Sequence, residues 1–359
     1  MILSGRQVKF RKISTIILGI LLLFSSHVGM ATAEKEHGEE EEFNPGKMIV
    51  DHVVDSHEWH ILTWGHKHVS IPLPVILYDE GNFIVFLSSK FHHPPHDFKY
   101  ELVEEGPNEG KIINIQTGEL PLDLSITKNV AAMLISMILI SILFISIGRS
   151  YTKRKGKAPK GLQSLLEPLI IFIRDDVAKA SIGEHKYKKY LPYLLTLFFF
   201  IFLNNLLGLV PIFPGGANLT GNIAVTGVMA LFTFIITTFS GNKNYWMHIV
   251  NTPGVPWWLK IPIPLMPIVE LMGVFTKPFV LMVRLFANIT AGHIIVLGFM
   301  SLIFIFGNMN PGIGFGVSIV SVLFSVFMAL LELLVAFIQA YVFTLLSALY
   351  FGMATEEHH

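Results

Sequence analysis

Five long apolar segments dominate the chain after residue 125, and they restrict its fold more than any other feature. They cover about residues 129–148, 189–212, 221–240, 265–306 and 313–353, each near or above the roughly 20 residues that a helix needs to span a bilayer. Inside hydrocarbon a backbone must satisfy its own hydrogen bonds, so each segment is expected to be a helix. The last two are too long for one straight crossing, and we expect two tilted helices that form a hairpin. The alternative is that each enters along the membrane interface before it crosses.

Composition supports a mainly α, polytopic membrane protein. Of the 359 residues, 52% are hydrophobic and 14% are charged, which lies outside the range of soluble domains. A net charge of zero gives no indication of nucleic-acid binding. The chain has no Cys, which excludes disulfides and thiol catalysis, and it has no Gly-rich phosphate loop. We therefore expect no nucleotide chemistry and no cofactor.

Residues 1–33 have the pattern of a secretory signal peptide. An apolar run, 13–24, is followed by Ala31-Thr-Ala33, which supplies small residues where a signal peptidase cleaves. The alternative is an uncleaved first membrane helix, but the acidic stretch 34–42 directly afterwards favours cleavage. The basic residues in front of the apolar run are Arg6, Lys9, Arg11 and Lys12.

Residues 34–125 are predicted to form a small external, periplasmic domain, and 126–359 the membrane domain. Within the external domain, Val69–Tyr78 and Phe83–Leu87 are separated by Asp-Glu-Gly-Asn, a pattern that predicts a β-hairpin. The domain also carries 9 of the 15 His residues. The fold is thus expected to combine five membrane helical segments with a β-containing external domain.

The external His residues offer a metal-binding alternative. His57 and His60 are predicted to share a helical face, and His66 and His68 a strand face, which would supply enough ligands for zinc. The spacing matches no sharp zinc motif, and the competing interpretation is a solvated surface. We expect no metal, with these four residues as the candidates if one binds.

Loop charges predict the orientation in the cell inner membrane. A basic loop between the first two segments carries no acid before Glu167, which places it in the cytoplasm under the positive-inside rule. Five crossings then leave the N-terminal domain outside and residues 356–359 in the cytoplasm. An amphipathic stretch, Leu162–Ala180, is expected to be an interfacial helix on the cytoplasmic side. The basic residues of the loop are Arg149, Lys153, Arg154, Lys155, Lys157 and Lys160.

Arg284 lies in the middle of one of the most apolar runs, although a guanidinium cannot lose its proton in a protein. A charge at that depth costs roughly 2.5–3.5 kcal/mol on insertion scales, so it indicates a function. At about 100° per residue, Glu270, Lys277 and Asn288 fall on the same helical stripe as Arg284, whereas His293 points to nearly the opposite side. Interfacial placement is the alternative for Glu270, and snorkelling for Lys277.

The last apolar segment has a polar stripe of its own, formed by Ser325, Glu332 and Gln339 at intervals of seven. If Glu332 faces His293, the two make a pair that can hand on protons, because imidazole titrates near neutrality and burial raises a carboxylate toward that range. Ordinary interhelical hydrogen bonding is the alternative for Gln339.

Taken together, these residues resemble the a subunit of F-type ATP synthases. The resemblance covers roughly residues 125–358, and residues 1–125 fall outside the common core. It rests on Lys277-Pro278, Arg284-Leu-Phe, Asn288, Ala291-Gly292, Gln339, Phe202–Pro211 and the ending Met353–His358.

The resemblance implies a non-catalytic stator subunit of the ATP synthase complex, pressed against a rotating c-subunit ring and joined by b-type peripheral stalk subunits and membrane lipid. By position, Arg284 would meet the ring carboxylate. Asn288, His293, Glu332 and Gln339 match the external half-channel, and Glu270 a position near the cytoplasmic exit. His293 and Glu332 appear exchanged relative to many bacterial members, as in the mitochondrial pattern. Gly208 stands where some members carry an acid.

Two alternatives come from other classes of protein. One is a secondary transporter, although internal inverted repeats are not evident and five crossings suit them poorly. The other is a membrane-anchored metal-binding protein that uses the external His residues.

Overall fold

The computed structural model describes residues 45–64, 67–103, 106–153, 157–210, 213–250 and 265–356. The predicted signal peptide, residues 1–33, lies outside the described residues, as do the acidic stretch after it, part of the basic loop (154–156) and the last residues, 357–359.

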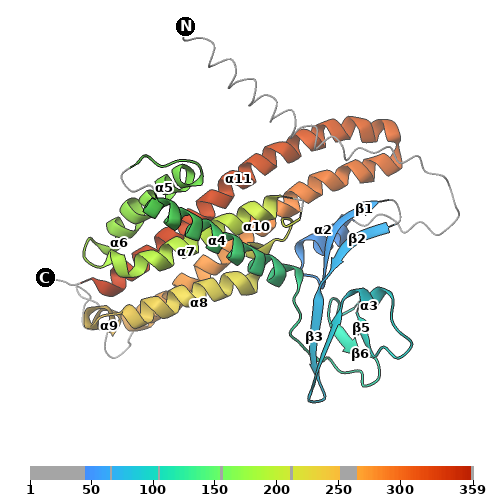
Figure 1. Cartoon of the computed structure of the whole chain (residues 1–359), viewed down its shortest axis with the longest axis horizontal. Helices are drawn as coiled ribbons and strands as arrows, with labels where there is room; N and C mark the ends of the chain where they lie inside the picture. The colour runs from blue at the N-terminus through green and yellow to red at the C-terminus, as the bar shows by residue number, and fades with distance from the viewer. Residues whose placement is uncertain are drawn as a thin grey trace, which may run out of the picture. The chain divides into compact units, whose positions relative to one another are not determined.

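Five helices in the described part of the chain are long and apolar enough to cross a membrane, as the five apolar segments predicted (Figure 1). The mainly α fold of a multi-pass membrane protein is confirmed. The five helices are α4 (Lys128–Lys153), α7 (Tyr187–Leu209), α8 (Ile223–Ser240), α10 (Leu265–Met309) and α11 (Pro311–Thr355).

The helices α10 and α11 have 45 residues each and pack against each other as a hairpin (Figure 1). At 1.5 Å per residue each is about 67 Å long, more than twice the ~30 Å of bilayer hydrocarbon. The turn between them is fixed by Asn310, whose side chain accepts a hydrogen bond from the Gly312 amide at 2.8 Å. A Cβ on Gly314 would lie 2.7 Å from the Gly307 Cα, so glycine permits the close approach beside the turn.

The core of the membrane helices is shared by α7, α8, α10 and α11, with α7 packed against α11. Phe198 and Leu194 of α7 are fully buried, and Tyr190 stacks on Phe351 of α11 with ring centroids 5.0 Å apart. Aromatic pairs of this kind add about 0.5–1.5 kcal/mol beyond their buried area. The α7 helix thereby forms the support against which the long hairpin is held.

The predicted helix Leu162–Ala180 is present, but it is not regular throughout. It comprises α5 (Leu162–Phe172), a π-helical stretch η1 (Ile173–Lys179) and α6 (Ala180–Ile182). The π-helical stretch follows Pro168 of α5. A salt bridge joins its last residue, Lys179, to Asp175, with Nζ and Oδ1 2.7 Å apart. A short helix, α9 (Lys243–Val250), follows α8.

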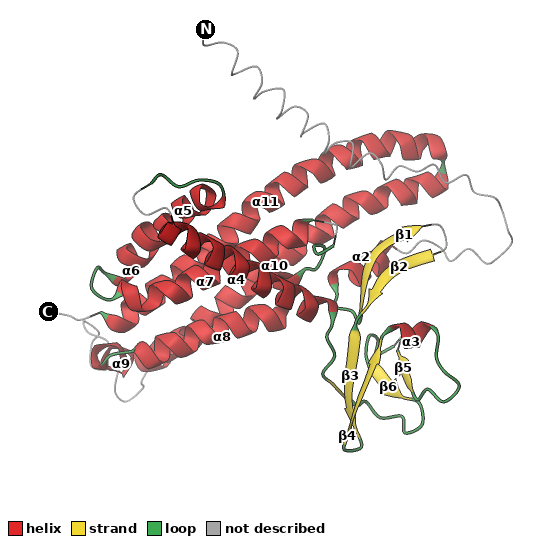
Figure 2. Ribbon diagram, viewed as in Figure 1, coloured by secondary structure: helices red, strands yellow, loops and turns green. Residues whose placement is uncertain are grey.

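The N-terminal region is built from short strands, as predicted (Figure 2). Antiparallel pairing joins β1 to β2, β3 to both β4 and β7, and β5 to β6. Its elements are α2 (Pro45–Val53), β1 (Glu58–Trp64), β2 (Lys67–Pro72), β3 (Pro74–Asp79), β4 (Asn82–Leu87), α3 (Ser89–His92), β5 (Tyr100–Leu102), β6 (Ile112–Asn114) and β7 (Leu122–Asp123).

The predicted strand Val69–Tyr78 is wrong in one respect, because it is divided at Leu73. The prolines on both sides of Leu73 cannot donate to a strand ladder, so one strand cannot pair continuously through them. Leu73 instead bonds to Ser88 through both its amide and its carbonyl, at 3.1 and 3.0 Å. The predicted hairpin is formed by the second part, β3, with β4, and its turn places Gly81 at φ +84°, where glycine is favoured.

The predicted helical face of His57 and His60 is also wrong, since the segment is extended. His57 precedes β1 and is buried, and its Nε2 lies 2.7 Å from the Asp123 carboxylate. Burial alone would raise the pKa of Asp123, but hydrogen bonds from His57 and Ser125 lower it to about 2. His60 is exposed on the strand, and His66 lies outside the described residues.

The N-terminal region is joined tightly to the first membrane helix. Asp55 accepts hydrogen bonds from the Asn129 amide at 3.0 Å and from the Thr127 hydroxyl at 2.7 Å. These bonds satisfy donors at the start of α4 and place a negative charge at its positive end. Trp59 of β1 also contacts Phe213, in the loop between α7 and α8, with ring centroids 5.1 Å apart.

Candidate functional site

The α10 helix has one buried and one exposed face around Arg284. Leu281, Leu285 and Ile289 recur every four residues and are 1–3% exposed, so they face the bundle. Arg284 and Asn288 consequently lie on the exposed face, as the predicted stripe required. In the part of the chain that the structure describes, no carboxylate lies within ion-pair distance of Arg284. Exposed apolar residues within one turn of it on α10 include Val280 and Val283.

His293 and Glu332 meet between α10 and α11. The Nδ1 of His293 and the Oε1 of Glu332 form a hydrogen bond, and the two side chains are only 18% and 7% exposed. The structure therefore brings together the imidazole and the carboxylate whose pairing the sequence analysis left as a condition. A buried carboxylate is costly unless it is paired, and the imidazole provides that partner.

Gly292 permits this close approach. A Cβ on Gly292 would lie 3.0 Å from Glu332 Oε1 and 3.1 Å from its Cδ, which is tighter than ordinary contact. The small residue next to His293 thus makes room for the carboxylate to reach the imidazole. Gly208 lies on the other side of the ring, since a Cβ there would be 3.7 Å from His293 Nε2. Gly208 therefore borders the pair formed by His293 and Glu332.

A buried polar chain that the sequence analysis did not assign to the site lies close to this pair. Asn205 of α7 donates to the Ala336 carbonyl at 3.1 Å, and the Thr220 hydroxyl donates to Asn205 at 2.6 Å. Both side chains are at most 3% exposed. Ala336 is one helical turn after Glu332, so the chain connects the α7–α8 loop with the polar stripe of α11. Two adjacent Asn residues in an apolar segment were the signal that could have found it.

The polar stripe of α11 is buried as predicted. Ser325, Glu332 and Gln339 are 3%, 7% and 7% exposed, although they lie on a helix whose other faces are largely apolar. Gln339 makes no hydrogen bond within the described residues, and the Ser325 hydroxyl has no partner there either. The stripe thus contains buried polar side chains, and those of Ser325 and Gln339 are unpaired among the described residues.

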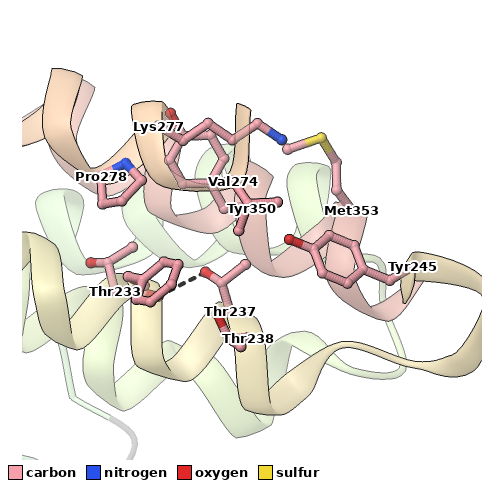
Figure 3. Close-up of a pocket in the computed structure, with 10 residues that line it drawn as sticks. Thr233, Thr237, Thr238, Tyr245, Val274, Lys277, Pro278, Tyr350 and Met353 are labelled. Carbon is pink, nitrogen blue, oxygen red and sulfur yellow. Dashed lines mark hydrogen bonds between the residues drawn. The ribbon is translucent and has the colours of Figure 1, made fainter. Parts of the chain in front are cut away.

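Lys277 and Glu270 precede Arg284 on α10. At 1.5 Å per residue they lie about 10 Å and about 21 Å from it along the helix axis. The Lys277 ammonium lies 5.6 Å from the centre of the Tyr350 ring, a cation–π geometry. It lines a cavity of about 10 Å³, the room needed by one water, together with Tyr245 and Thr237 (Figure 3). Burial raises the pKa of Tyr245, and the nearby charge of Glu270 adds to the rise.

The four His residues proposed as metal ligands are not assembled in the described part of the chain. No group of three or more His, Asp or Glu side chains there is placed to hold a metal ion. His57 is instead hydrogen-bonded to Asp123. His60, three residues later in β1, is exposed. His66 and the side chain of His68 lie outside the description.

Comparison with known proteins gives two family matches. The family model described as ATP synthase A chain matches residues 130–352, and a domain of unknown function (DUF8433) matches residues 48–130.

Three relatives illustrate the similarity of individual proteins. ATP synthase subunit a of Chloroherpeton thalassium is 45% identical over 245 residues, which is 66% of this chain and 69% of that protein. ATP synthase subunit a 2 of Chlorobaculum tepidum is 48% identical over 239 residues, covering 65% and 64%. The Myxococcus xanthus subunit a is 45% identical over 245 residues, covering 66% and 75%.

Proposed function

The chain belongs to the ATP synthase A chain family, and from that premise we propose that it is the stator subunit that carries protons past a rotating c-subunit ring. Proton flow across the membrane would be coupled to ATP synthesis or hydrolysis elsewhere in the complex. The chain itself performs no chemistry on nucleotide.

One observation carries the proposal: Arg284 is a permanent cation on an exposed apolar face, without a carboxylate partner in the described residues. A charge in that position needs an anionic partner from outside the chain. A carboxylate on each ring subunit meets this need, because the guanidinium stabilises its ionised form as it crosses the apolar interface. Arg284 also separates the two aqueous paths and so prevents a direct proton leak.

The external half-channel is proposed to run along the polar residues between α7, α10 and α11. His293 and Glu332 form its central pair, with Asn288 on the exposed face of α10 and Gln339 two turns further along the buried stripe of α11. Proton transfer between neighbouring imidazole and carboxylate groups is efficient when their proton affinities are similar. Asn205 would keep the path in place through its bond to α11.

The cytoplasmic half-channel is proposed to leave the membrane near Glu270. Its charge acts on Tyr245, which lines the water-sized cavity beside Lys277. A carboxylate at this end of α10 can receive protons released by the ring and pass them to water.

Cysteine crosslinking tests the contact with the ring. Because the chain has no native Cys, Asn288→Cys is a unique reactive site on the proposed ring face. We expect it to form a disulfide with a cysteine introduced on the c-subunit helix that carries the ring carboxylate, within the assembled complex. Ser347→Cys, which is fully buried against α8, is the control that should not crosslink. Equal crosslinking of both variants, or of neither, would argue against this contact.

Gly292→Ala tests the geometry of the His–Glu pair. The added Cβ would lie 3.0 Å from the Glu332 carboxylate, so the pair must widen by a few tenths of an ångström or break. We expect ATP-driven proton pumping in membrane vesicles to fall several-fold while the complex assembles. Gly298→Ala is the matched control, since a Cβ there meets nothing within 4 Å. Unchanged pumping in Gly292→Ala would show that the close approach is not required.

We also propose the orientation that loop charges predict, with the N-terminal domain outside and the basic loop inside. The absence of native Cys permits a direct test. Glu40→Cys should react with a membrane-impermeant maleimide in intact cells from which the outer membrane has been made permeable, and Gly156→Cys should react only after the inner membrane is opened. Labelling of both positions from the same side would refute the proposed topology.

A further inference from the structure

A cavity of about 520 Å³ lies where three membrane helices end, away from the proposed proton path. It is lined by residues at the start of α7, the end of α8 and the end of α11. We refer to it as the basic pocket. Its lining consists of His185, Lys186, Lys188, Lys189, Tyr190, Ser240, Asn242 and Thr355.

The basic pocket concentrates positive charge. Three lysines and one histidine line it, and none of its lining residues is a carboxylate. The 23-residue α7 begins at Tyr187 without a side-chain cap, so the positive end of its dipole adds to the field. Lys186 also donates to the Thr355 carbonyl at 2.7 Å, which secures the end of α11. Lys188 and Lys189 are exposed at the mouth. The pocket is therefore suited to an anion.

The position of the basic pocket at the ends of membrane helices indicates which kind of anion it binds. The pocket lies at the ends of α7, α8 and α11, three helices long and apolar enough to span the membrane. Residues at the ends of membrane helices lie at the level of the lipid headgroups. Basic pockets between membrane helices at this level recognise phosphate-bearing headgroups. The volume is also within the range that encloses a small polar group.

An exposed apolar stripe continues from the pocket toward the membrane centre. It begins at Phe239, next to the lining residue Ser240, with 86% of its surface exposed. The following members recur at helical spacing along α8, so they share one face. A free phosphate has no apolar part that could contact such a stripe, whereas the acyl chain of a lipid would lie along it. The stripe consists of Phe239, Ile235, Phe232 and Val228.

We propose that the basic pocket binds the headgroup of an anionic phospholipid, whose acyl chain lies along α8. Lys188 and Lys189 would contact the phosphate from the mouth, and the positive end of the α7 dipole would add to the attraction. This site goes beyond the proposed proton-carrying function and requires only that α7 and α8 span the membrane. Bound lipid would fix the spacing of α7, α8 and α11 at this end.

Photolabelling in the assembled complex tests the proposal. The complex is reconstituted in phosphatidylcholine vesicles that contain a little phosphatidylglycerol with a photoreactive acyl chain, and the labelled peptide is then mapped. We expect labelling of residues 223–240, and a decrease of roughly 10- to 30-fold in Lys188→Gln/Lys189→Gln, because each lysine at a membrane surface contributes about 1 kcal/mol. Lys157→Gln/Lys160→Gln removes two exposed charges on the same side and should label like the unaltered chain.

Four results decide the matter. Lys188→Arg/Lys189→Arg, which retains both charges, should label normally, so a loss restricted to the Gln variant supports the charge-dependent site. Equal labelling of the Gln variant would overturn it. Equal labelling by a phosphatidylcholine probe would also overturn it, since only bulk lipid would then be detected. Displacement of the label by millimolar inorganic phosphate would identify free phosphate as the occupant and refute the lipid.

Discussion

Arg284→Ala should leave the complex assembled and abolish ATP-driven proton pumping. The side chain lies on the exposed face of α10, so its removal disturbs little packing within the chain, whose core on this helix is formed by Leu281, Leu285 and Ile289. What is lost is a positive charge at an apolar interface. Removing a preorganised charge of this kind typically costs about 10²–10³ in rate. The ring carboxylate would then have to cross that interface without a counter-charge.

Arg284→Lys should also fail largely, although it retains a cation. Lysine loses its proton readily when it is desolvated, and it lacks the planar fork that binds a carboxylate through two hydrogen bonds. The outcome distinguishes a specific guanidinium requirement from a general need for positive charge. If Arg284→Lys pumps as fast as the unaltered complex, only the charge is required.

Both variants can be measured in inverted membrane vesicles by quenching of a pH-sensitive dye on addition of ATP. Arg149→Gln is a matched control, because it removes an exposed arginine near the C-terminal end of α4, a different membrane helix. The amounts of ring and catalytic subunits in the membranes show whether assembly is normal. Normal pumping by an assembled Arg284→Ala complex would refute the counter-ion role.

The sequence predicted the membrane fold well because the bilayer imposes simple rules. Apolar length identified the five spans found in the described residues, and the excess length of the last two was visible before the hairpin was seen. Helical spacing also predicted which polar side chains share one face of α10 or of α11. Arg284 and His293 are nine residues apart and lie on different faces, so one is exposed and the other reaches Glu332 of the next helix.

Features that depend on tertiary contacts were missed. Nothing in the local pattern showed that Asn205 would bond to the α11 backbone, or that Gly292 would make room for a carboxylate from another helix. In the N-terminal domain, the strand break at Leu73 follows from its flanking prolines and was readable in principle. The extended conformation at His60 was not, because its pairing with Ser70 of β2 outweighs the spacing of two histidines.

The second large effect concerns His293 and Glu332, which are expected to act as one unit. His293→Ala and Glu332→Ala should each slow proton pumping by roughly 100-fold, the lower end of the usual contribution of a positioned acid or base. The double variant should be little worse than the worse single variant. Residues that act together are non-additive, because removing either one already removes the function of both.

The direct contact in the structure supports this expectation. The imidazole and the carboxylate share a hydrogen bond, so loss of one leaves the other buried without its partner. Thr344→Ala is a suitable control, since this buried hydroxyl bonds only within α11 and should have little effect on pumping. Fully additive losses in vesicle assays, that is, a double variant slower by the product of the two single effects, would show that the residues act separately.

Exchanging the two residues provides the sharper test. In His293→Glu/Glu332→His the acid and the imidazole still face each other, but each stands on the opposite helix. If the pair matters more than the location of either member, the exchanged variant should pump faster than both single Ala variants, although below the unaltered complex, because the space beside Gly292 is shaped for a carboxylate from α11. An exchanged variant as slow as the double Ala variant, in an assembled complex, would show that each position has its own chemical requirement.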